Sequence, residues 1–252
     1  MSVFSNFIKF NRNLYNKIAR YFPQTSFNIW QYYHQQVKQN IADKYKILDI
    51  GGGKNCSFAG ERKNFDDITI IALDVSEEEL QYNHDVDLKI INDITSGQPI
   101  PEIENTSIDL VTSSSVLEHL KNLEAAVTEI SRVLKPGGKF ISLLPNKFAL
   151  FAIINQMLPN WLARKILFSI QPSAKGVAGF RAYYNNCWYG ALKKLLVKHG
   201  FEVLDFAFNF HQSNYFGFFV PLALISLLWD YFMYKLGIKN CCAYISFTAV
   251  KK

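Results

Sequence analysis

Short runs of apolar residues alternate with amphipathic segments through the middle of the chain. The runs are rich in Ile, Leu and Val, and they lie at 45–50, 68–75, 88–94, 108–115 and 139–145. Continuous apolar runs of this length predict parallel strands that are covered on both faces. The segments at 76–84 and 122–138 predict helices between them. This alternation predicts an α/β fold with a doubly wound, mostly parallel sheet and a ligand site at the carboxyl ends of its strands.

The two ends of the chain follow other patterns. Residues 1–44 are aromatic and basic and predict a helical N-terminal segment. Near the C-terminus, a helix, a glycine turn at Gly200 and two further strands bring the expected sheet to seven strands. Two apolar and basic insertions, at about 147–180 and 211–240, interrupt this part of the chain.

Charge is distributed unevenly along the 252 residues. The net charge is +6 for residues 1–46, −9 for 47–146 and +9 for 147–252. An acidic middle between basic ends indicates two tasks in one chain. The four cysteines lack the spacing of a zinc site or a disulfide framework, and the N-terminus lacks the apolar region of a signal peptide. The sequence therefore predicts a cytoplasmic protein with reduced thiols and no bound metal.

The segment "ILDIGGGKN" at 47–55 is the first candidate for chemistry. The turn Gly51-Gly52-Gly53 lets the backbone approach a ligand closely, because no Cβ atom intervenes. Asp74 ends the second predicted strand, where a carboxylate can accept hydrogen bonds from both hydroxyls of a ribose. Nicotinamide and adenosyl cofactors both offer such a ribose, so the turn and Asp74 leave the choice between them open.

Three features favour an adenosyl cofactor with a cationic centre. Cys56 stands at the third glycine of the dinucleotide pattern G-x-G-x-x-G, and the phosphate-binding pattern G-x-x-x-x-G-K-[ST] is absent. Asp49, Asp74 and Asp93 would surround a pyrophosphate with negative charge. They suit the sulfonium, amine and ribose of S-adenosylmethionine (SAM) instead. Asn55 stands where a further glycine is expected, and asparagine tolerates positive φ better than most residues.

Five segments, taken together, resemble the class I SAM-dependent methyltransferases, and most closely the methyltransferase type 11 group. They are "ILDIGGGKN", "IIALDVS", "INDIT", "IDLVTSSSVLEHL" and "EISRVLKPGGKFISLLPN". The resemblance covers about 45–146 and the terminal hairpin, and it implies a Rossmann-like methyltransferase domain over 45–252. The chain departs from the family pattern at Asn55 and in the short stretch between the loop and the second strand, which leaves little room for the usual first helix.

The resemblance also implies roles for individual residues. Glycines of the turn would approach the methionine part of SAM, with Asp49 near its amino group. Asp74 would hold the ribose, and Asp93 with the backbone of Ile94 would meet the adenine. The full set expected to bind the cofactor is Asp49, Gly51, Gly52, Gly53, Asp74, Val75, Asp93, Ile94, Ser113 and Ser114.

Methyl transfer is an in-line displacement that needs orientation more than acid–base groups. A general base helps if the acceptor is a hydroxyl. His119, just after the fourth predicted strand, is the candidate base, and Tyr184 and His211 are candidates to line the acceptor pocket. Each of these three side chains also has an ordinary reading as a packed or hydrogen-bonded structural residue.

The composition of the two insertions indicates the chemical class of the methyl acceptor. Residues 215–229 carry no charge, but they are shorter than the roughly 20 residues of a membrane span and contain Pro221. Residues 147–175 are apolar with basic residues and no acid, the last basic residue being Lys175. Such segments suit a surface that lies on anionic lipid, a hydrophobic lid or a homodimer face. The expected acceptor is a small molecule or a lipid-like one, such as a lipid, an isoprenoid or a lipid-linked saccharide.

Three other functions were weighed against this interpretation. Nucleic acid is disfavoured as a substrate because the basic ends are rich in Phe, Leu and Ile and form no stripe of Lys and Arg. A non-catalytic SAM-binding scaffold protein is the main alternative, since no catalytic base is certain. The hypothesis that the chain is an NAD-dependent oxidoreductase has only the glycine-rich turn in its favour.

Overall fold

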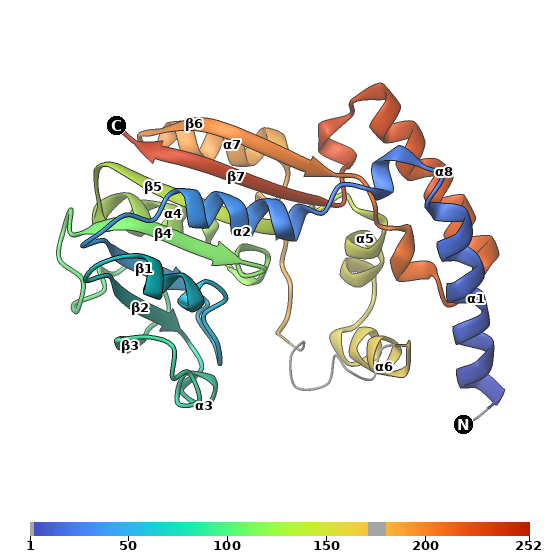
Figure 1. Ribbon diagram of the computed structural model, residues 1–252, viewed down its shortest axis with the longest axis horizontal. Coiled ribbons are helices and arrows are strands. Elements are labelled where there is room, and N and C mark those ends of the chain that lie inside the picture. Colours follow the sequence, from blue (N-terminus) through green and yellow to red (C-terminus); the bar gives the residue numbers. More distant parts are fainter. Residues whose placement is uncertain (1–2, 171–179) are drawn as a thin grey trace.

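The computed structural model describes residues 3–170 and 180–252, which form a single sheet flanked by helices (Figure 1). The sheet has seven strands in the order β3-β2-β1-β4-β5-β7-β6. Neighbouring strands among β1 to β5 are parallel, and β7 runs antiparallel to both β5 and β6. The strands are Lys46–Ile50 (β1), Thr69–Asp74 (β2), Leu88–Ile91 (β3), Ile108–Ser114 (β4), Leu134–Pro145 (β5), Phe201–Asn209 (β6) and Tyr244–Lys251 (β7). The predicted α/β fold with a mostly parallel seven-stranded sheet is confirmed.

Eight α-helices lie in the described residues. They are Val3–Ala19 (α1), Ile29–Gln39 (α2), Glu77–Leu80 (α3), Leu123–Val133 (α4), Leu150–Met157 (α5), Asn160–Ile170 (α6), Tyr189–Lys198 (α7) and Val220–Leu236 (α8). Between β1 and β2 the chain forms only the short 3₁₀ helix Ala59–Asn64 (η2). The short stretch noted in the sequence therefore does replace a full first helix.

Helices cover both faces of the central strands, which explains their continuous apolar runs. Successive residues of a strand point to opposite faces, and Ile47 and Leu48 of β1 are both fully buried. Ile47 belongs to a cluster with Tyr33 and Val37 of α2. Leu48 belongs to a second cluster with Ile130 of α4 and with residues of α7. Neither face of β1 is left to solvent.

Four helices stand apart from the sheet, beyond the carboxyl ends of the parallel strands (Figure 1). Helices α1 and α8 lie side by side, and α5 and α6 lie between this pair and the sheet. The short 3₁₀ helix Ser213–Phe216 (η5) packs against α8. We call α1, α5, α6, η5 and α8 the helical half, and the remainder the sheet half. The two predicted insertions form most of the helical half, except that Lys175 lies outside the described residues.

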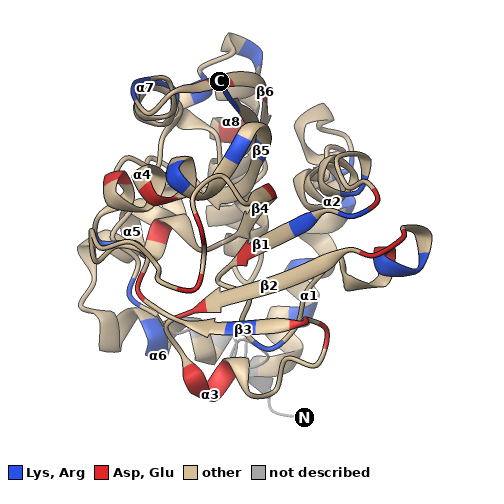
Figure 2. Ribbon diagram, turned by 90° about the vertical axis from the view of Figure 1, so that its left-hand side faces the viewer, with Lys and Arg blue, Asp and Glu red and all other residues tan. Residues whose placement is uncertain are grey.

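The helical half has its own small core, in which Tyr15 of α1 meets Phe216, Ala223 and Leu227. In Figure 2 the acidic residues appear on α3, on α4 and along the loops of the sheet half. No helix in the described part of the chain is long and apolar enough to cross a membrane.

Candidate active site

The glycine turn follows β1 directly and is held against β2. The N–H groups of Gly51 and Gly52 both donate to the carbonyl of Leu73, at 2.7 and 3.3 Å. The Gly52 carbonyl accepts a hydrogen bond of 2.9 Å from the buried amide of Asn83. The positive φ angles of the turn are +73° at Gly51 and +39° at Gly53, and Asn55 has none. The expectation that Asn55 serves by tolerating positive φ was therefore wrong, because the turn makes its left-handed bends earlier.

Asp74 closes the turn from the end of β2. One of its carboxylate oxygens accepts the N–H of Gly53 at 3.1 Å, and the other accepts the N–H of Ser76 at 2.9 Å. Ser76 also caps α3, since its hydroxyl accepts the N–H of Glu79. A carboxylate has about four acceptor sites, so Asp74 keeps sites for two ligand hydroxyls. Both bonds to the backbone fix its orientation for that task.

Asp49 lies beneath the turn and not at its surface. It is 9% exposed and accepts a hydrogen bond of 2.8 Å from the hydroxyl of Thr112 on the neighbouring strand β4. Burial, with a smaller contribution from the charge of Asp74, raises the pKa of Asp49 to about 7, although the hydrogen bond from Thr112 acts in the opposite direction. A cation bound above the turn would favour the ionised form of Asp49.

Val116 connects the glycine turn to the loop that follows β4. A Cβ atom on Gly51 would lie 2.2 Å from a methyl carbon of Val116, so only glycine allows this contact. Ser115, one residue earlier, has a φ of +57° and donates its N–H to Leu143 of β5. The loop that carries His119 is therefore packed directly onto the turn. Sequence reasoning missed Val116, because an apolar residue after a strand carries no distinctive signal.

The other residues expected to bind the cofactor differ in burial and in hydrogen bonding; they are Val75, Asp93, Ile94, Ser113 and Ser114. The Asp93 carboxylate accepts the N–H and the hydroxyl of Thr95, which forms a local turn after β3. Ile94 is buried beside it, and Val75 is more than half exposed. Ser113 is fully buried and exchanges a 2.8 Å hydrogen bond with Ser142 of β5, whereas Ser114 is exposed at the strand end. Contact of these residues with a cofactor stays a prediction.

His119 has the geometry of a neutral base. Its Nδ1 lies 3.0 Å from the carbonyl oxygen of Arg181, and a carbonyl only accepts, so Nδ1 carries the proton of the neutral ring. The lone pair then lies on Nε2, in a side chain that is about one third exposed. Burial lowers the pKa of His119, which keeps the ring neutral and able to take a proton near pH 7.

Glu118 is a buried acid that sequence reasoning did not assign to the site. One carboxyl oxygen lies 3.7 Å from Nε2 of His119, and the other is buried without a hydrogen-bond partner among the described residues. Burial raises the pKa of Glu118 to about 8. Its backbone carbonyl accepts the N–H groups of Tyr183 and Tyr184, at 2.7 and 3.0 Å. The loop after β4 is thus tied to the segment after α6 as well as to the glycine turn.

Three tyrosines gather around Glu118. Tyr184 is buried with a φ of +55°, a strained value for a large side chain, and its hydroxyl lies 3.5 Å from the amide of Asn155 on α5. Tyr215 of η5 hydrogen-bonds the hydroxyl of Tyr244 on β7. Burial raises the pKa of all three hydroxyls, and the nearby charge of Glu118 adds to the effect. This cluster joins the sheet half to the helical half.

Phe151 of α5 adds an aromatic wall to the tyrosine cluster. Its ring stacks on Tyr215 with centroids 4.5 Å apart and on Tyr244 at 5.6 Å. His211 has different partners: its Nε2 lies 2.7 Å from the hydroxyl of Tyr15 on α1, and the two rings stack. The ring of His211 thus contacts the helical half, while its backbone N–H donates to Asn209 of β6. Of the expected catalytic residues, only His119 and Tyr184 share a neighbourhood, through Glu118.

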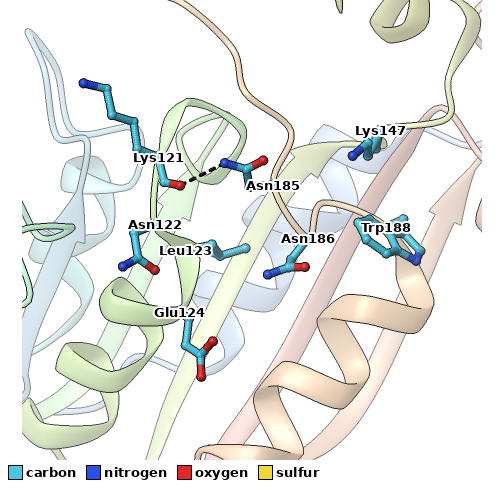
Figure 3. A pocket seen from close by; sticks show the side chains of 8 residues that line it. All are labelled: Lys121, Asn122, Leu123, Glu124, Lys147, Asn185, Asn186 and Trp188. Carbon is cyan, nitrogen blue, oxygen red and sulfur yellow. Dashed lines mark hydrogen bonds between the residues drawn. The ribbon is translucent and has the colours of Figure 1, made fainter.

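A polar recess of about 300 Å³ lies beside this cluster (Figure 3). Its lining residues are Lys121, Asn122, Leu123, Glu124, Lys147, Asn185, Asn186 and Trp188. Asn185 donates to the carbonyl of Lys121 at 2.8 Å, and the Lys147 ammonium lies 5.3 Å from the centre of the Trp188 ring. Since all eight residues come from 121–124, 147 and 185–188, the recess lies next to the site and outside the glycine turn.

Comparison with known proteins identifies the domain. Residues 48–142 match the family described as a methyltransferase domain. The structure of a SAM-dependent methyltransferase from Mesorhizobium loti has a TM-score of 0.56 at 14% sequence identity, over 90% of this chain and 100% of that one. At this identity the likeness is one of fold.

Two relatives extend the comparison. A demethylmenaquinone methyltransferase of Leptospira interrogans is 26% identical over 180 residues, which are 65% of this chain and 69% of that protein. The mitochondrial arginine-hydroxylase NDUFAF5 of Rattus norvegicus is 31% identical over 121 residues, and this chain covers 34% of its length. The matched family model and the shared sheet lead to one conclusion: residues 48–142 form a methyltransferase domain, in a chain with the fold of the SAM-dependent methyltransferases.

Proposed function

We propose that the protein binds SAM and transfers its methyl group to a lipid-like acceptor, such as a quinone or an isoprenoid. The contact between Val116 and Gly51 carries this proposal, because it fixes the loop of His119 directly against the turn that would hold the cofactor. A base held this close to the cofactor can meet an acceptor placed in line with the methyl group.

The residues of the turn fit SAM as the ligand. Asp74 would accept hydrogen bonds from the ribose hydroxyls, since its two bonds to Gly53 and Ser76 leave acceptor sites free. The negative charge of Asp49 and Asp74 would attract the cationic sulfonium of SAM. The same charge would repel the anionic pyrophosphate of a dinucleotide. Bound SAM supplies a methyl group on a positively charged sulfur.

His119 is proposed to accept the proton of an acceptor hydroxyl on Nε2. Its Nδ1–H stays on the Arg181 carbonyl, which holds the ring orientation while the proton is transferred. The nearest Glu118 oxygen, at 3.7 Å, would stabilise the imidazolium that forms. Tyr184 is proposed to line the acceptor pocket.

The aromatic wall supports a lipid-like acceptor. Phe151 and Tyr215 come from the apolar insertions and meet Tyr244 at the end of the sheet. Flat apolar surfaces of this kind suit an aromatic or unsaturated acceptor. The name of the Leptospira relative, a demethylmenaquinone methyltransferase, agrees with this class. We also propose that the protein meets such an acceptor as a peripheral protein on a membrane surface.

Calorimetric titration with SAM tests the cofactor. Asp74→Ala should weaken SAM binding by at least 50-fold, on the order of the loss of two charge-assisted hydrogen bonds. The exposed Asp66→Ala serves as the matched control and should bind SAM like the wild type. Equal affinities in the two variants would refute the role of Asp74, and no heat from the wild-type protein would refute SAM as the ligand.

Turnover requires a separate measurement, because one relative is named an arginine-hydroxylase. SAM labelled in its methyl group is incubated with the protein and a demethylated quinol, the reduced form that carries the hydroxyl whose proton His119 would accept, and the lipid phase is counted. Label in the lipid, lost in His119→Ala, supports the proposed transfer. Tight SAM binding without labelled product from quinol, isoprenoid or polar extracts would favour a non-catalytic SAM-binding scaffold instead.

A further inference from the structure

Helix α8 presents many large apolar side chains to solvent, while its buried face includes two polar ones, Ser226 and Asp230. Among its residues Ser226 and Asp230 are almost fully buried, with 2% and 1% exposed. The outward positions, at a spacing of three or four residues, are Leu222, Ile225, Leu228, Trp229, Phe232 and Leu236, each 39% to 67% exposed. A surface helix of a water-soluble domain normally has the reverse pattern. The outer face of α8 is therefore built for an apolar environment.

Helix α1, which lies along α8, repeats the pattern. Tyr15 and Ala19 face the core of the helical half, whereas Phe7, Phe10 and Leu14 are 48%, 67% and 39% exposed. The two helices belong together, because Asn11 of α1 accepts the N–H of Val220 at the start of α8. We call the outward apolar side chains of α1 and α8 the apolar face. It is large enough to mark an interaction site, since water-soluble monomers rarely expose so many large apolar side chains together.

The charges around the apolar face are of one sign. Helices α1, α5 and α6 contain no Asp or Glu. The only acid on α8, Asp230, is buried and accepts the N–H groups of Gln212 and Ser213 at 3.0 Å each. The basic residues on or beside these helices are Lys9, Arg12, Lys17, Arg20, Arg164, Lys165, Lys235 and Lys239. The partner of this face must therefore be apolar and negatively charged.

We propose that the apolar face docks on a bilayer that contains anionic lipid, with α1 and α8 lying in the membrane plane. The exposed Phe, Trp and Leu side chains would enter the boundary between head groups and acyl chains, and the Lys and Arg residues would meet the phosphates. A second copy of the chain is a poorer partner, because pairing the faces would bring like charges together. Docking does not depend on methyl transfer.

The docked face is joined to the tyrosine cluster through η5. Helix η5 packs against α8, and its residue Tyr215 hydrogen-bonds Tyr244 of the sheet. A lipid leaving the bilayer would thus pass the elements that carry Phe151 and Tyr215. This step alone rests on the proposed function.

Vesicle flotation with the full-length protein tests the docking. Vesicles of phosphatidylcholine with 30% phosphatidylglycerol are compared with pure phosphatidylcholine, at low and at high salt. The double variant Ile225→Ser/Phe232→Ser is set against a matched double variant on the sheet half, Val197→Ser/Leu204→Ser, whose side chains are 58% and 53% exposed. All four positions are exposed, so each variant should fold.

The wild type and the control should float with the anionic vesicles, and the α8 variant should bind at least 10-fold more weakly. High salt should weaken wild-type binding. Failure of the wild type to float, or equal flotation of both variants, would overturn the proposal. A dimer that dissociates only in the α8 variant, without flotation of the wild type, would identify a second copy as the partner instead. Calorimetric titration of the same samples with SAM measures cofactor binding independently, so a loss of flotation can be told apart from a loss of SAM binding.

Discussion

The two halves of the molecule use their acidic residues in opposite ways. In the sheet half, Asp74 and Asp93 stand at the ends of strands, where their carboxylates fix loops and remain near the surface. In the helical half, Asp230 is turned inward and fully enclosed, and the surface is left to apolar and basic side chains. The same residue type thus stands at the proposed ligand site in one half and fixes a loop to a helix in the other. Asp74 and Asp93 keep their carboxylates near the surface, whereas Asp230 does not.

The largest effect on stability and SAM affinity is expected at Gly51 in the sheet half, where the structure leaves no room for a side chain. Gly51→Ala should cost roughly 1–2 kcal/mol for the left-handed conformation and roughly 1–3 kcal/mol for the clash with Val116. Because the clash displaces the turn, SAM affinity should fall about 100-fold or more. Chemical denaturation and calorimetry measure the two losses.

Gly97→Ala is the matched control for Gly51→Ala. Gly97 has nearly the same φ, +75°, but no atom lies within 4 Å of its added Cβ among the described residues. It should therefore show the conformational cost without the clash, and SAM binding should be unchanged. If both variants lost affinity equally, the contact with Val116 would not be what holds the site together.

The sheet half could largely be predicted from the sequence. Apolar runs and strand-end glycines are local signals, so the strand positions and the glycine turn at Gly51 could be predicted from short segments, while the expected contacts of Gly51 and Asp74 with a cofactor stay predictions. Ser76, the first residue of the predicted helix at 76–84, caps α3 by accepting the N–H of Glu79. The exception was Asn55, whose expected positive φ is taken instead by Gly51 and Gly53.

The acceptor side could not be predicted in the same way, because it is assembled from distant segments. Glu118, Tyr184, Tyr215 and Tyr244 meet only once the helical half has folded onto the sheet. Only Tyr184 was a candidate from its own segment, and the other three carry no distinctive local signal. The packing of α8 against η5 likewise determines that Asp230 points inward. The sequence indicated an apolar segment at 215–229, but it did not indicate which side of the helix faces solvent.

An intermediate effect on the free energy of unfolding is expected at Asp230, the buried acid of the helical half. Asp230→Ala removes the acceptor of two buried N–H groups, those of Gln212 and Ser213. Leaving them unpaired should lower the free energy of unfolding by roughly 2–4 kcal/mol. Urea denaturation measures this loss. Glu202→Ala, in an exposed ion pair with Lys252, should change stability by less than about 0.5 kcal/mol. A loss below about 1 kcal/mol in Asp230→Ala would mean that Asp230 does not hold α8 to the loop before η5.

The most specific effect is expected at Glu118, where the two halves meet. Its pKa is about 8 in the folded protein and 4.5 ordinarily, so between these values the folded state binds the proton more strongly than the unfolded state. The stabilisation is complete below about pH 4.5 and is lost as pH rises through 8. Glu118→Gln stays neutral at every pH, so its Tm should fall less than that of the wild type between pH 5 and pH 8.5.

The expected difference between Glu118→Gln and the wild type is on the order of 10 °C, since a pKa raised from 4.5 to about 8 corresponds to roughly 4 kcal/mol between pH 5 and pH 8.5. About 1 kcal/mol corresponds to roughly 2–4 °C in a domain of this size. Asp49, with its pKa raised to about 7, remains in both proteins, so the variant should keep part of the pH dependence. The exposed Glu78→Gln on α3 should follow the wild-type curve. Parallel curves for Glu118→Gln and the wild type would mean that Glu118 is solvated, and that the tyrosine cluster is open to water before any acceptor arrives. A reduced slope would instead mean that the helical half already seals the junction, so that an acceptor must displace protein contacts to reach His119.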